Sequence, residues 1–279
     1  MNLKFIVNDY ILIWNLLFQA SISSEVQKLK QKLWVNYKKE YNITFKDREL
    51  ILKDPKNFIS NDDTIYNIFL DSKEYEHIKK ATEKYRNSVL ELWDGNKKII
   101  NKELKDILRF DVKLCHIYVV SDLLDIIDAS FISTHSINNI ILGKKIDNKD
   151  KNKLIVDLVY EIIKKQTDNF KPEYKEIVQA VIELAILNEF STRLDNRSHY
   201  LTGDSTLSFL KRQIYPYWLM YLGADSSEML DYMTRDKIAF DIDKYTYEKQ
   251  LKKVDLLQFI DFCIRNQKYI IKINELEII

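Results

Sequence analysis

The chain has 279 residues, of which 46% are hydrophobic and 30% are charged, and this composition excludes a wholly disordered protein. It holds only 4 glycines and 3 prolines, where average usage gives roughly 33 in total, so we expect few of the turns that a many-stranded β protein needs. The 43 basic and 42 acidic residues leave a net charge of +1, which indicates no polyanionic or polycationic partner.

The cysteines and the N-terminal stretch predict the compartment. Cys115 and Cys263 form no CxxC pair, and we expect both to be buried free thiols in a reducing cytosol. The most apolar N-terminal stretch, residues 5–20, is interrupted by asparagine, aspartate and glutamine, so it matches neither a membrane-spanning helix nor a signal peptide. The sequence therefore predicts a cytoplasmic protein with no membrane partner.

The first 110 residues have helical periodicity. We expect helices over residues 9–20, 25–41, 61–71 and 73–108, the second of them with a lysine-rich polar face. Residues 25–57 contain nine basic and five acidic residues. A surplus of this size is typical of a solvated helix face rather than of a nucleic-acid groove.

The pattern changes after residue 110. Residues 112–120 and 138–142 are rich in β-branched and aromatic side chains and predict two strands. Further helices are predicted over residues 154–166, 172–194, 205–214, 226–234 and 253–266. We therefore expect a mainly α fold with a small β region. It would comprise a helical region, 1–110, and an α+β to helical region, 111–279, which either fold separately or share one core.

Two of these helices carry polar side chains among apolar ones. In the helix over residues 154–166, Asp157, Tyr160, Glu161 and Lys164 are spaced to form one narrow polar stripe. In the next helix, Glu183 interrupts a run of apolar residues, and a carboxylate buried in such a run needs a partner. These are the candidates for chemistry in this part of the chain.

The order of strand, loop, polar-striped helix and carboxylate-bearing helix over residues 112–194 resembles the core of the gluzincin zinc metallopeptidases. In that family one helix carries an HExxH motif, and in one branch a glutamate that follows after eighteen further residues is the third zinc ligand. Here the pentapeptide from Tyr160 to Lys164 lies at the motif position, and Glu183 has the spacing of the third ligand. The resemblance implies a degenerate zincin-like core, with Glu161 at the position of the general base.

Both histidine positions of the motif depart from the family, because Tyr160 and Lys164 replace the pair that would hold zinc. We therefore expect no metal and no other cofactor. The family geometry brings the positions of Lys164 and Glu183 together, which implies an ion pair where zinc would lie. Alternatively, the polar stripe is simply the exposed face of a packed helix, with Glu161 and Lys165 paired.

A second polar cluster occupies residues 188–204. In the functional interpretation it lines a ligand pocket with Arg193, Arg197, His199 and Tyr200. In the structural interpretation it is a helix end and loop held by local ion pairs, and in either case we expect Glu189 and Arg193 to pair at i, i+4.

No complete catalytic set is visible, so we expect a non-catalytic protein that acts by binding a protein or a small molecule. One alternative is a metal-dependent hydrolase, a peptidase that uses Glu161. A further alternative is a nucleic-acid-associated protein that uses the lysine-rich N-terminal helices.

Overall fold

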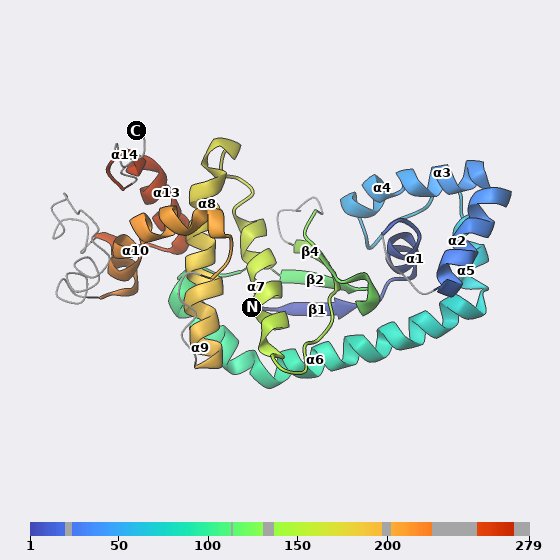
Figure 1. Cartoon of the computed structure of the whole chain (residues 1–279), viewed down its shortest axis with the longest axis horizontal. Helices are drawn as coiled ribbons and strands as arrows, with labels where there is room; N and C mark the ends of the chain where they lie inside the picture. Colours follow the sequence, from blue (N-terminus) through green and yellow to red (C-terminus); the bar gives the residue numbers. More distant parts are fainter. Residues whose placement is uncertain (20–23, 113, 131–136, 197–201, 225–249, 271–279) are drawn as a thin grey trace. The chain divides into compact units, whose positions relative to one another are not determined.

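The computed structural model describes residues 1–19, 24–112, 114–130, 137–196, 202–224 and 250–270. This part of the chain is mainly helical with one small sheet, so the predicted fold class is confirmed (Figure 1). No helix in these ranges is both long enough and apolar enough to cross a lipid bilayer. The helix predicted over 226–234 lies outside the described residues, as do Arg197, His199 and Tyr200 of the predicted pocket.

The chain forms two compact units, each built from two separate segments. Unit 1 comprises Met1–Lys97 and Val112–Ile162, and unit 2 comprises Lys98–Asp111 and Ile163–Ile279. This grouping differs from the predicted regions 1–110 and 111–279, because the unit boundaries fall inside two continuous helices. Helical periodicity alone cannot show where such a helix changes its packing partners.

Unit 1 contains a four-stranded sheet in the order β1-β2-β4-β3. β1 (Leu3–Ile6), β2 (Leu114–Val119) and β4 (Ile137–Gly143) run parallel, whereas β3 (Ile126–Asp128) runs antiparallel to β4. The predicted strands at 112–120 and 138–142 correspond to β2 and β4. β1 and β3 were not predicted, because strands of four and three residues carry too little pattern and depend on partners distant in the sequence.

The core of unit 1 lies around α1 (Asp9–Phe18). The Asn8 side chain caps this helix by accepting a hydrogen bond from the Ile11 N–H at 3.0 Å. Buried apolar side chains from α1, β2 and β4 share one cluster with those from the following helices. These helices are α2 (Ser24–Asn36), α4 (Arg48–Lys53) and α5 (Thr64–Leu70), and α3 (Lys38–Lys46) adds the partly buried Tyr41.

The helix predicted over 25–41 is divided into α2 and α3. Tyr37 stands between them with φ −135° and ψ 46°, which is outside the helical region. Trp34 and Tyr41 nevertheless meet across this break, with ring centroids 5.4 Å apart in an edge-to-face arrangement. The sequence pattern continues through Tyr37, so local periodicity did not reveal the break.

The long helix α6 (Lys73–Leu108) has the predicted bounds. It ends at Arg109, whose φ of 56° is left-handed and therefore stops the helical path. The next helix, α7 (Asn152–Gln166), places the predicted polar stripe at its surface, with Asp157, Tyr160 and Glu161 half-buried and Lys164 exposed.

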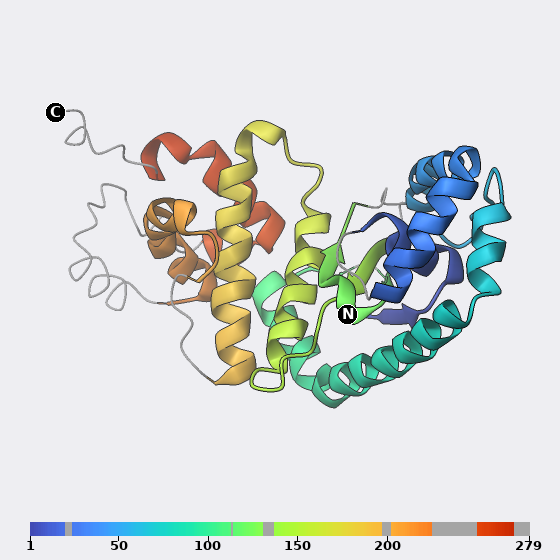
Figure 2. The same ribbon diagram turned by 45° about the vertical axis from the view of Figure 1, so that its right-hand side comes forward.

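In unit 2 the helix predicted over 172–194 is continuous in direction but not in type (Figure 2). It begins as η2 (Pro172–Tyr174) and α8 (Lys175–Ile182), widens into the π-helix η3 (Glu183–Phe190), and ends as α9 (Ser191–Asp195). α10 (Ser208–Leu222) and α13 (Leu256–Arg265) pack against α8, and α14 (Gln267–Ile270) follows. α10 runs through Pro216, beyond the end at residue 214 that the sequence predicted, and ends at Gly223.

Both cysteines are free and buried, as predicted. Cys115 lies on β2, and burial raises the pKa of its thiol to about 11. Cys263 lies on α13, and burial raises the pKa of that thiol further still. Both groups are therefore thiols rather than reactive thiolates near neutral pH.

Candidate ligand-binding site

Glu183 is buried at the start of the π-helix, where 1% of its surface remains exposed. Its Oε2 atom accepts hydrogen bonds from the Lys211 Nζ at 2.6 Å and from the Asp204 backbone N–H at 3.1 Å. Its Oε1 atom accepts one from the Gln179 side-chain amide at 3.0 Å. Both carboxylate oxygens are therefore bonded to donors from within unit 2. π-helical segments often occur at functional sites, so the residues around Glu183 are candidates for a functional site.

Lys211 and Gly203 close the space around this carboxylate. Lys211, on α10, has no exposed surface, and its Nζ also donates to the Thr202 carbonyl at 3.0 Å. Gly203 adopts a φ of +109°, and a Cβ at this position would collide with the Glu183 carboxylate. The loop before α10 therefore packs directly on Glu183.

The prediction that a buried Glu183 has a charged partner is confirmed, but the predicted partner is wrong. Lys211 pairs with Glu183, whereas Lys164 is exposed on α7. The reason is that α10 packs against α8 and η3, a contact between segments that sequence spacing could not reveal. The Lys165 Nζ lies 2.5 Å from Asp168 Oδ2, and the alternative pairing of Glu161 with Lys165 stays a prediction.

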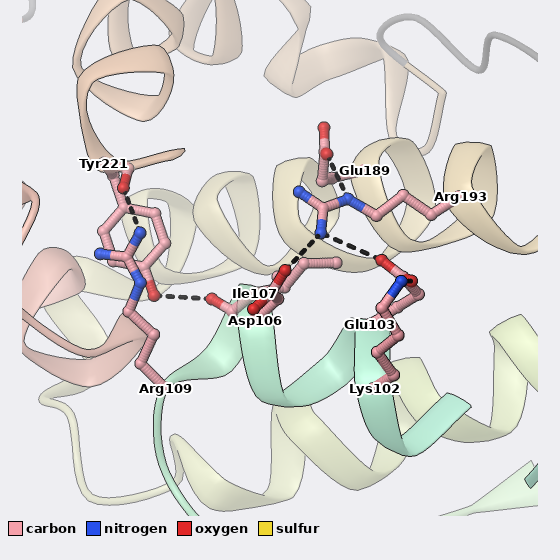
Figure 3. A network of polar contacts seen from close by, with 8 residues as sticks. All are labelled: Lys102, Glu103, Asp106, Ile107, Arg109, Glu189, Arg193 and Tyr221. Carbon is pink, nitrogen blue, oxygen red and sulfur yellow. Dashed lines mark hydrogen bonds and ion pairs between the residues drawn. The ribbon is translucent and has the colours of Figure 1, made fainter. Parts of the chain in front are cut away.

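Arg193 is held by carboxylates on two helices (Figure 3). Its Nε pairs with Glu189 Oε1 at 2.6 Å, which confirms the predicted i, i+4 pair. Its Nη1 reaches Glu103 Oε2 at 3.1 Å and Asp106 Oδ2 at 3.6 Å, both on the last turns of α6. Burial by itself would raise the pKa of Glu103, but hydrogen bonds from Lys102 and Arg193 hold it below the usual value.

Arg109 binds backbone carbonyls rather than carboxylates. Its Nη2 donates to the Tyr221 carbonyl at 2.6 Å (Figure 3), and its Nη1 donates to the carbonyls of Leu251, Lys252 and Val254 at 3.1–3.3 Å. Its guanidinium also lies 4.2 Å from the centroid of the Tyr221 ring. Arg109 therefore joins the end of α6 to the end of α10 and to the segment before α13.

The two arginines border an open cavity of about 590 Å³ at the end of α6. The lining residues are Lys105, Asp106, Arg109, Phe110, Asp111, Arg193 and Leu222. Both guanidiniums are engaged with protein acceptors, and the remaining charges are of both signs. We interpret this cavity as the surface of a structural junction, so Arg193 serves the fold here.

A second cavity, a groove of about 270 Å³, lies between the last turn of α7 and α8. Its apolar walls are formed by Phe170, Pro172, Val178 and Ile182, and Thr167 and Gln179 contribute polar groups. A mostly apolar concave surface with a few polar groups is typical of sites that bind small molecules. Gln179 also contacts Glu183, so the groove is separated from the buried ion pair by one side chain.

Lysines surround this groove. Lys164, Lys171 and Lys175 line it together with one acid, Asp168, which is paired with Lys165. The Lys171 Nζ lies 4.0 Å from Glu173 Oε1, but both side chains are largely exposed, so this ion pair is weak. The groove therefore combines an apolar floor with a positively charged rim.

The sequence analysis identified Lys164 at this groove but missed Lys171, Lys175 and the apolar floor. The signal that could have revealed them is the pair of lysines flanking Pro172, next to apolar residues at helical spacing on α8. The predicted pocket with Arg197, His199 and Tyr200 stays a prediction, because those residues lie outside the described ranges. Comparison of the chain with protein-family models, with curated proteins and with solved structures gives no match.

Proposed function

We propose that this chain acts by binding, and that the groove lined by residues 164–182 takes a ligand with an apolar body and an anionic group. The observation that carries the proposal is the combination of apolar walls with three rim lysines. The apolar walls favour burial of hydrocarbon, and the lysines favour a carboxylate or phosphate placed at the rim.

The surroundings of Glu183 support a non-catalytic role. The resemblance to gluzincins calls for zinc held by positions 160, 164 and 183, but tyrosine and lysine replace the histidines, and Lys211 neutralises Glu183. An ammonium group 2.6 Å from the carboxylate competes with a cation for the same oxygen. In the described residues, no three His, Cys, Asp or Glu side chains are grouped to hold a metal. These donors do not fit zinc, and we propose that any zincin-like core is degenerate.

Metal analysis separates this proposal from a peptidase that uses Glu161. We expect the purified protein to contain well below one zinc per chain, because the donor set at positions 160, 164 and 183 does not fit the ion. Inductively coupled plasma mass spectrometry after mild chelation measures this content. One zinc per chain that survives chelation would contradict the proposal and favour the hydrolase.

The groove is tested with octanoate and 1-octanol, two probes with the same chain length and different charge. Calorimetric titration should show that octanoate binds more tightly than 1-octanol, because only octanoate carries a negative charge. Lys175→Met and Lys171→Met should each weaken octanoate binding by about two- to fivefold, the range expected for one exposed charge, and should leave octanol binding unchanged. Val178→Ala removes part of the apolar wall and should weaken both probes.

Lys253→Met is the matched control, since Lys253 is an exposed lysine of unit 2 that does not line the groove. This variant should change neither the affinity for octanoate nor the affinity for 1-octanol. Equal affinity for the two probes would show that the rim lysines do not recognise the anionic group. Failure of all variants to alter octanoate binding would overturn the assignment of the groove as the site.

A further inference from the structure

A row of aromatic rings in unit 1 comes from the end of α1, from α2 and α3, and from Tyr37 between α2 and α3. Trp34, Tyr37 and Phe45 remain 43%, 38% and 56% exposed. Trp34 and Phe45 are connected through Tyr41 and Phe18: Trp34 contacts Tyr41, Tyr41 contacts Phe18, and Phe18 contacts Phe45, with centroids 5.0–5.4 Å apart. We call these five side chains the aromatic row. Large aromatic rings exposed together indicate an interaction surface.

Lysines are interleaved with the aromatic row. Residues 24–46 contain six lysines and two glutamates. The Lys38 Nζ lies 5.3 Å from the centroid of the Trp34 ring, so one cation is adjacent to the most exposed indole of the chain. At Trp34 and Lys38 the segment therefore presents a ring and a positive charge at the same surface, which a merely solvated helix face does not require.

We propose that the aromatic row binds single-stranded nucleic acid, and this proposal is independent of the groove in unit 2. Exposed rings stack on unpaired bases of any sequence, and interleaved lysines neutralise the backbone phosphates. In a duplex the bases are stacked on one another and cannot stack on the rings, so a duplex would contact only the lysines. A helix lying on a membrane instead keeps its lysines opposite a broad apolar face. Here the Lys38 ammonium and the exposed Trp34 ring lie at the same surface rather than on opposite faces, which favours a nucleic-acid strand.

Trp34 provides a direct test. The other three tryptophans, Trp14, Trp93 and Trp218, are at most 5% exposed, so stacking should quench Trp34 emission selectively. A fluorescein-labelled 20-nucleotide oligo(dT) should bind the full chain in fluorescence anisotropy, more tightly than a 20-base-pair duplex. Trp34→Ala should weaken binding about tenfold, within the range measured for loss of one stacking ring. Lys38→Gln should weaken it less and reduce its salt dependence.

Leu90→Ala is the control, because Leu90 is also an exposed apolar side chain of unit 1 but lies on α6, outside the aromatic row. It should leave oligo(dT) binding unchanged, and thermal melting should confirm that every variant is folded. The proposal is overturned if Trp34→Ala leaves the affinity unaltered or if the duplex binds as tightly as the single strand. It is also overturned if the chain ignores oligo(dT) and sediments with phosphatidylserine vesicles through Trp34, which would identify a membrane surface.

Discussion

Replacing Glu183 by alanine is expected to lower the free energy of unfolding by about 3–5 kcal/mol, the range found when one partner of a buried ion pair is removed. The variant leaves the Lys211 ammonium without its carboxylate in a site with no solvent exposure. It also removes the acceptor for the Asp204 N–H and the Gln179 amide. Urea unfolding followed by circular dichroism measures the change.

The double variant Glu183→Leu with Lys211→Met should recover more than half of this loss, because apolar side chains of similar volume replace both buried charges. Arg265→Ala is the control for an exposed pair. Arg265 pairs with Asp261 on α13 with 75% of its side chain exposed, so its loss should change stability by less than about 0.5 kcal/mol. If Glu183→Ala were as stable as the wild-type chain, the buried ion pair would be refuted.

Arg109→Ala is expected to destabilise the chain by about 2–4 kcal/mol, since it removes hydrogen bonds from a charged donor to four backbone carbonyls. The change also removes the guanidinium that lies over the Tyr221 ring. Because the acceptors are neutral carbonyls, the loss should vary little with pH or with salt concentration. Urea unfolding at low and high salt measures both properties.

Arg109→Lys should recover only part of the loss, because an ammonium group cannot reproduce the planar fork that reaches Tyr221 and the 251–254 segment together. Arg212→Ala is the matched control on α10, where the arginine is exposed, and it should be nearly neutral. A fully stable Arg109→Ala variant would show that the end of α6 is not held through this side chain.

The sequence by itself determined the features that depend on local pattern. The bounds of α6 follow from 36 residues of continuous helical periodicity, and β2 and β4 follow from their β-branched and aromatic content. The Glu189–Arg193 pair was also predictable, because residues four positions apart on a helix lie on the same face. The low glycine and proline content correctly indicated a mainly helical fold.

The tertiary structure alone decided which distant segments meet. Lys211 rather than Lys164 neutralises Glu183, because α10 packs on α8 and η3. The groove exists only because the segment after α7 lies against α8, and β1 becomes a strand only by pairing with residues 115–118. Each of these contacts joins residues whose separation in the sequence carries no periodic signal. Their partners are selected by the burial of apolar surface and by the need to pair buried polar groups, which are properties of the folded chain as a whole.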